Sequence, residues 1–188
     1  MDSREERLRK YVAELESFSN KLSAREKSLL NHGVLSSLAT ALLDKTVFEI
    51  ARELQEIQQI KEKDLFQQRQ AMISEQARAK ERLLERQQQE VVQCQSLPDH
   101  VTVAVIEKNH RERQRFETSC LLQLQRLDKE AVEELDQYVT QQQTILEKAG
   151  VPGFCTTRDT RSIRFQMVVL KLIMHLAMYE RHSSSADH

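Results

Sequence analysis

Residues that interrupt helices are scarce in this sequence. Its 188 residues include 3 glycines, 2 prolines and no tryptophan, and aromatic residues make up only 5% of the chain. Apolar residues make up 39%, below the roughly 45–50% of typical globular domains, which disfavours a compact spherical core. The abundant residues are Glu, Lys, Arg, Gln, Leu and Ala, as in long helices and coiled coils. The composition therefore predicts an all-α protein with a narrow apolar seam.

Charge and cysteine content exclude several classes of protein. The formal net charge is −1, so no field of the whole chain attracts nucleic acid or anionic lipid. An odd number of widely spaced cysteines argues against a disulfide framework and favours a reducing compartment. They are Cys94, Cys120 and Cys155. The charged N-terminus lacks the apolar region of a secretory signal, so we expect an intracellular protein.

Residues 46–148 are predicted to form two long helices that fold back on each other, with the turn at 96–99. Pro98 cannot continue the first helix, and Asp99 suits the start of the second. Thr46 and Glu49 fit a capping box at the beginning of the first helix. A cation, a glycine and a proline in Lys148–Pro152 mark the end of the second.

Both long helices carry apolar residues at helical spacing, densely near the outer ends and sparsely near the turn. In the first helix these positions are Leu43, Val47, Ile50, Leu54, Ile57 and Lys61, widened by Ile60, Leu65 and Phe66, then Met72, Gln76, Ala79, Leu83, Gln87 and Val91. In the second they are Val101, Val105, Lys108, Phe116, Cys120, Leu124, Leu127, Ala131, Leu135, Tyr138, Gln142 and Ile145. A flanking stripe of Leu121, Val132, Val139 and Leu146 suits contact with more than one neighbouring helix.

Residues 1–45 are predicted to form N-terminal helices that pack on a bundle. Arg4–Leu22 has one apolar stripe, and Asp2 or Ser3 can cap its start. Gly33 fits a left-handed helix stop, after which Ser36 or Ser37 would cap a short helix.

Residues 149–182 are predicted to form a loop and an apolar helix, and residues 183–188 a disordered tail. Phe154 is expected to fold back onto the bundle, and Asp159 or Thr160 to open the helix. The most apolar stretch, Ile163–Tyr179, carries Arg164 and Lys171, so we expect no membrane span. The fold class is therefore all-α, an elongated antiparallel coiled-coil hairpin with a small helical bundle at its open end.

Two segments carry a family resemblance. Residues 41–50 (ALLDKTVFEI) and 146–154 (LEKAGVPGF) resemble segments of the Gonadal / DiGeorge syndrome critical region protein family, and the match extends roughly from Leu35 to Leu176. The resemblance implies a coiled-coil protein of development and gametogenesis, nuclear or cytoplasmic, with no enzyme activity and no cofactor.

Candidate chemistry is sparse. Asn109–Arg115 matches N-x-x-E-R-x-R, the core of a basic helix-loop-helix DNA contact, but no loop follows until Gly150 and acidic residues would face phosphates. A solvated helix face is the favoured interpretation. The histidines and cysteines lack metal-ligand spacing, and His175 fits a hydrogen-bonded core residue. We expect no catalytic, metal or cofactor site.

The favoured hypothesis is a non-enzymatic adaptor that binds protein partners by helix–helix packing along the sparse part of the hairpin. The candidate partner-binding residues are Met72, Leu83, Val91, Val101 and Val105. The alternatives are a self-associating structural rod, in which the same region makes a homodimer, and a nucleic-acid-associated regulator. No specific nucleic acid is expected.

Overall fold

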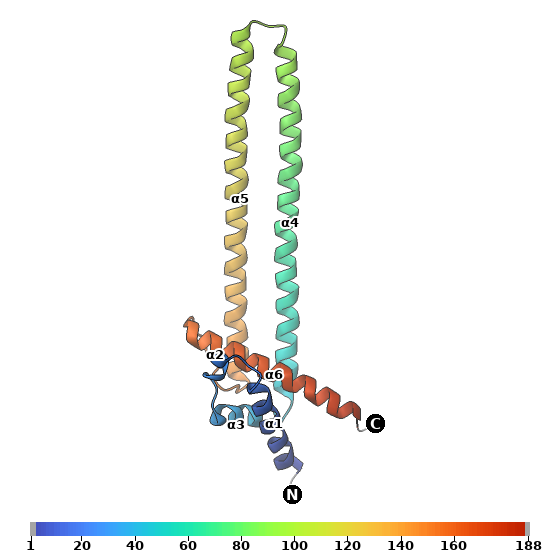
Figure 1. Ribbon diagram of the computed structural model, residues 1–188, viewed down its shortest axis with the longest axis vertical. Helices are drawn as coiled ribbons and strands as arrows, with labels where there is room; N and C mark the ends of the chain where they lie inside the picture. The colour runs from blue at the N-terminus through green and yellow to red at the C-terminus, as the bar shows by residue number, and fades with distance from the viewer. Residues whose placement is uncertain (1–2, 187–188) are drawn as a thin grey trace. The chain divides into compact units, whose positions relative to one another are not determined.

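A computed structural model describes residues 3–186 of the chain (Figure 1), and every regular element within them is a helix. The all-α prediction is confirmed. The helices are α1 (Ser3–Ser19), α2 (Ala24–Lys27), α3 (His32–Ala41), α4 (Thr46–Cys94), α5 (Asp99–Lys148) and α6 (Thr160–Ala186). Contacts divide the chain into unit 1, Met1–Gln59 with Asp136–His188, and unit 2, Ile60–Leu135.

Unit 1 has the hydrophobic core. α1 contacts α3 and α6, and α2 contacts α6. The side chains with the lowest exposure come from every long element of this unit, since apolar stripes at helical spacing converge here. They are Tyr11, Leu15, Leu38, Leu42, Val47, Leu146, Val169, Leu172, Ile173 and Leu176.

The loop between α5 and α6 is held by a helix stop and by two buried glutamines. Gly150 has a left-handed backbone (φ 74°), and its N–H donates to the Glu147 carbonyl at 3.0 Å, as the sequence predicted for this helix end. Gln143 donates to Gln166 Oε1 at 2.9 Å, and Gln166 donates to the Cys155 carbonyl at 2.9 Å. Phe154 is 7% exposed and packs into the core, which confirms the expectation that it folds back.

The first helix and the last helix start close to the predicted positions. α1 places Tyr11 and Leu15 of its predicted stripe in the core. The Asp2 cap lies outside the described residues. At α6, Asp159 Oδ2 accepts from the Ser162 N–H at 2.8 Å and so caps the helix, as predicted.

The structure corrects four predictions about element ends. Gly33 is no helix stop, and Ser36 and Ser37 are no caps, because Asn31 caps α3 and accepts from the Val34 N–H at 2.9 Å. Thr46 begins α4 without the predicted capping box. Its N–H donates to Asp44 Oδ1 at 3.1 Å, and Lys45 before it has a left-handed backbone (φ 68°) that turns the chain.

The fourth correction concerns the C-terminal tail, because α6 continues to Ala186. The Ser183 hydroxyl donates to the Tyr179 carbonyl at 3.0 Å, a bond that fits a continuing helix. Residues 183–186, expected to be disordered, are therefore helical, and 187–188 lie outside the described residues.

Unit 2 consists of the second part of α4 and the first part of α5, which lie side by side (Figure 1). α4 ends at Cys94 and α5 begins at Asp99, so the predicted break at the proline is confirmed within a residue. Hydrogen bonds join Gln76 to the Cys120 carbonyl at 3.0 Å and Gln87 to the Asn109 carbonyl at 3.1 Å. Residue numbers in α5 fall as those of α4 rise.

Candidate functional site

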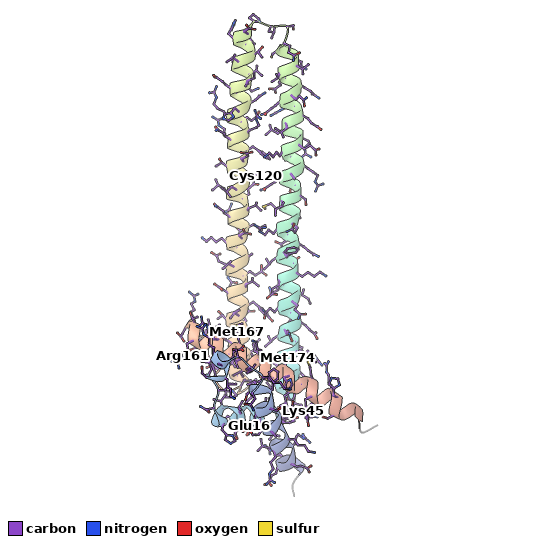
Figure 2. The ribbon with its side chains drawn as sticks, in the orientation of Figure 1. Glu16, Lys45, Cys120, Arg161, Met167 and Met174 are labelled. Carbon is purple, nitrogen blue, oxygen red and sulfur yellow. The ribbon has the colours of Figure 1, made fainter. Side chains whose placement is uncertain are left out.

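The seam of unit 2 is the line of residues along which α4 and α5 face each other. Each of its members is buried or half-buried. The seam comprises Leu65, Met72, Gln76, Ala79, Leu83, Gln87 and Val91 of α4, and Val101, Val105, Asn109, Phe116, Cys120, Leu124, Leu127 and Ala131 of α5. Figure 2 shows Cys120 on the side of α5 that faces α4.

The structure brings all five predicted partner-binding residues into the seam. Met72 lies four residues before Gln76 and Leu83 four residues before Gln87, and both glutamines bond to α5. Val105 likewise lies four residues before Asn109. Since residues four apart share one face of a helix, all three lie on the inward faces of their helices. Val91 and Val101 are half-buried in the same way. All five lie along the line where α4 and α5 face each other, and each keeps part of its side chain exposed.

The structure places Asn109 in the seam, where the sequence predicted Lys108. The Asn109 side chain is 2% exposed, whereas the Lys108 ammonium reaches Glu90 of α4 at 3.3 Å on the flank of the pair. The cause is desolvation, because a buried ammonium costs far more free energy than a buried amide.

Gln87 and Asn109 form a buried amide pair inside the seam. Gln87 Nε2 donates to the Asn109 carbonyl at 3.1 Å and to Glu112 Oε2 at 3.0 Å. Asn109 Nδ2 donates to the Gln87 carbonyl at 3.5 Å. The side-chain oxygens Gln87 Oε1 and Asn109 Oδ1 accept no hydrogen bond. A buried amide pair of this kind favours one register of the two helices at a cost in stability.

Ion pairs bridge α4 and α5 on both flanks of the seam. Arg69 contacts Asp128 at 2.8 Å and Lys80 contacts Glu117 at 2.9 Å on one flank. Arg86 contacts Glu112 at 2.5 Å on the other. The hydrogen bond from Lys80 lowers the pKa of Glu117. Solvent screens exposed pairs such as these, so they fix the alignment of the helices more than they stabilise the fold.

Unit 1 has a groove of about 720 Å³ between the first turns of α4 and the second half of α6. Phe48, Met174 and Met178 line it, as do Lys45 and Glu180, which form an ion pair at 2.7 Å. Figure 2 shows Met174 and Met167 on α6. Met167 is 56% exposed, although the sequence placed it on the same face as Met174.

One helix of the described residues is long and apolar enough to cross a membrane by length and composition alone. It is Thr160–Ser183 in α6, with a mean hydropathy of 1.2 over its most apolar window. A helix packed in the core of a soluble protein has the same composition, and Val169, Leu172, Ile173 and Leu176 are 0% exposed in the core of unit 1. The two residues that interrupt this stretch with charge, Arg164 and Lys171, are not buried.

His175 joins α6 to α1. Its ring stacks on Phe18 with centroids 3.9 Å apart, and its Nε2 lies 2.7 Å from Glu14 Oε1. The predicted hydrogen bond is therefore present, while the side chain is half-buried, 26% exposed. Within residues 3–186, no group of three or more His, Cys, Asp or Glu side chains could hold a metal ion.

Glu26 ties α2 to α6 through a dense set of hydrogen bonds. Lys171 Nζ lies 2.5 Å from Glu26 Oε1, and the Ser23 hydroxyl donates to Glu26 Oε2 at 2.7 Å. The Glu26 N–H donates back to Ser23, which completes a capping box. The hydrogen bond from Lys171, then those from Ser23, lower the pKa of Glu26 to about 2.

Replacing Glu26 by Gln should therefore make the free energy of unfolding less dependent on pH in the acid range. The folded-state pKa of Glu26 lies below its ordinary value, so its contribution is present above pH about 4.5 and is lost as the pH falls toward 2. Urea unfolding from pH 2 to pH 7 should show wild type more stable than Glu26→Gln at neutral pH, with the difference closing in acid. A difference that stays constant across this range would contradict the assigned contacts.

Known proteins resemble this chain over most of its length. A family model described as "DiGeorge syndrome critical region 6 (DGCR6) protein" matches residues 1–185. Protein DGCR6 of Gallus gallus is 36% identical over 186 residues, covering 99% of this chain and 92% of that protein. Gonadal protein gdl of Drosophila melanogaster is 26% identical over 166 residues, covering 88% and 77%. No solved structure matches. The chain belongs to the DiGeorge syndrome critical region 6 family, as its sequence resemblance suggested.

Proposed function

We propose that this protein is a non-enzymatic adaptor that binds other proteins by helix–helix packing. The observation that supports this most is the seam of unit 2, where apolar residues such as Leu83 and Val105 are only half-covered by the opposite helix. A third helix that lays an apolar stripe along this seam would complete their burial. The setting in development or gametogenesis, and placement in nucleus or cytoplasm, belong to the same proposal.

The paired stretches of α4 and α5 in unit 2 are, in this proposal, an antiparallel coiled-coil hairpin. The order of the cross-helix bonds supports it, from Arg69 with Asp128 to Gln87 with Asn109. So does the spacing of the seam, in which Leu65, Gln76 and Gln87 repeat every 11 residues. Such a repeat corresponds to about 3.67 residues per turn, close to that of an unstrained helix, so the pair needs little supercoiling.

Recognition of nucleic acid and insertion into a membrane are not part of the proposal. Asn109 of the N-x-x-E-R-x-R motif is buried and Glu112 pairs with Arg86, so two of the motif's key residues are engaged with α4. Likewise, the apolar residues of α6 are used in the core of unit 1.

Trimming the seam should abolish capture of protein partners. We expect the double variant Leu83→Ala with Val105→Ala to lose partners that wild type retains in a pull-down analysed by mass spectrometry, because the exposed edge of the seam is removed. The matched control is Leu122→Ala with Val103→Ala, which truncates the same residue types at 59% and 54% exposed positions away from the seam.

Circular dichroism separates loss of binding from loss of helix in these variants. If the seam variant keeps its helicity and retains the same partners as wild type, the seam is not the binding surface.

A further inference from the structure

Unit 2 has an apolar face that neither the core of unit 1 nor the seam accounts for. Six large apolar side chains on it are 40–62% exposed. They are Phe66 (62%), Leu84 (40%) and Val92 (56%) of α4, and Ile106 (47%), Leu121 (57%) and Val132 (58%) of α5. Single exposed leucines are ordinary on protein surfaces, whereas several large apolar side chains on one face indicate an interface.

Helix geometry places these residues on one flank of each helix. Every one of them either follows a seam residue by one position, as Leu121 follows Cys120, or precedes one by three, as Leu84 precedes Gln87. At about 100° per residue, one step forward and three steps back turn the side chain in the same direction, by about 100° and about 60°. The six side chains therefore leave the seam on the same side of their helix.

An ion pair shows that the two flanks belong to one face of unit 2. Lys80 precedes Leu83 by three and Glu117 follows Phe116 by one, so both occupy the flank that carries the apolar row. Their side chains meet at 2.9 Å. The flank of α4 with Phe66 and Leu84 thus adjoins the flank of α5 with Leu121.

The charges on this face balance, which decides what kind of partner fits it. Its charged residues are Arg69, Lys80 and Arg113 against Glu62, Glu117 and Asp128, and two cation–anion pairs among them are already formed within the chain. A face without net charge gives no advantage to a partner of opposite charge. A second copy can meet it without like-charge repulsion, since a two-fold contact requires a surface that complements itself.

The size of the face is also adequate. Two helices of about 35 residues are roughly 50 Å long and together about 20 Å wide, so one face offers about 1,000 Å², more than the roughly 800 Å² per partner of a standard interface.

We propose that this apolar face is the interface of a homodimer, in which the helix pairs of two copies pack face to face. The inference rests on the proposed function as a helix-packing protein and names a second copy as one partner.

Neighbouring leucines provide a sharp test. Leu121 on the apolar face and Leu122 on another side of α5 are 57% and 59% exposed, so substitution should affect folding of the monomer equally. Sedimentation velocity over a wide concentration series should show wild type as a monomer–dimer equilibrium. Leu121→Glu should raise the dissociation constant roughly tenfold or more, while Leu122→Glu should leave it unchanged.

A milder variant, Leu121→Gln, keeps helix propensity and should weaken the dimer in the same direction. A wild-type chain that stays monomeric at every concentration would overturn the inference, as would equal weakening by Leu121→Glu and Leu122→Glu. The proposed adaptor function fails separately, since a monomer could still retain partners through the seam in the pull-down.

Discussion

Replacing Leu172 by Ala is expected to lower the free energy of unfolding by about 3 kcal/mol. Leu172 is 0% exposed on α6 and belongs to the core that α1, α3, α4 and α6 build together. Removal of its side chain leaves a cavity that helices on several sides cannot close at once, so both transfer free energy and packing are lost. Urea denaturation followed by circular dichroism measures the change in midpoint.

Met167→Ala on the same helix is the matched control for this core substitution. Met167 is 56% exposed, so truncation of a side chain of similar size should change the free energy of unfolding by less than about 0.5 kcal/mol. Equal losses for the two variants would mean that α6 does not bury Leu172 in a core.

Replacing Asn109 by Asp is expected to destabilise the protein by about 3 kcal/mol or more at pH 7. The side chain is 2% exposed, its amide donates to the Gln87 carbonyl, and Gln87 in turn donates to Glu112. The aspartate carboxylate has no N–H to donate, so its oxygen would face the Gln87 carbonyl oxygen. The Glu112 carboxylate would also lie nearby. Burial would raise the pKa of the new carboxyl in the folded state.

The sign of the pH dependence follows from that raised pKa. The penalty should be absent below the unfolded-state pKa of about 3.9 and should grow as the pH rises toward neutrality. Asn109→Leu removes the unpaired oxygen and should change stability by only about 1 kcal/mol. Unfolding of both variants from pH 3 to pH 7 tests this, and a pH-independent loss with Asp would contradict the burial of this site.

Much of the fold follows from local residue chemistry, and the breakers were the most reliable signals. Pro98 ends the first long helix and the Gly150 stop ends the second, because each excludes continued helix for its own steric reason. The positions of Met72, Leu83 and Val105 in the seam were predictable as well, since helical spacing depends on geometry alone.

The misplaced ends arose where several local signals competed. Asn31 and Gly33 both mark helix ends, and the sequence does not state which one prevails; Asn31 caps and Gly33 enters the helix. The capping-box motif S/T-x-x-E occurs at Ser23 and at Thr46. Of these two, only the motif at Ser23 forms a capping box, because Lys45 turns the chain before Thr46.

The apolar pattern also overestimated what is buried. Ile57 and Ile60 were assigned to the seam, yet they are 45% and 67% exposed. In unit 1 the buried positions of α4 include Leu54, whose carbonyl accepts a hydrogen bond from the Tyr138 hydroxyl of α5. The spacing of apolar residues gives no sign of such polar contacts, and it placed Lys108 rather than Asn109 in the seam.

The most direct test of the helix pair is a distance between spin labels at Gln70 and Gln125, two exposed positions of unit 2. The labels replace single cysteines in a variant whose three native cysteines are serine, and a Gln70–Gln88 pair along α4, about 27 Å apart, calibrates the measurement. Helices packed side by side lie about 8–10 Å apart, so pulsed electron paramagnetic resonance should find the labels at Gln70 and Gln125 within about 30 Å. A distance near 80 Å, the length of 55 residues of straight helix at about 1.5 Å each, would contradict the folded pair.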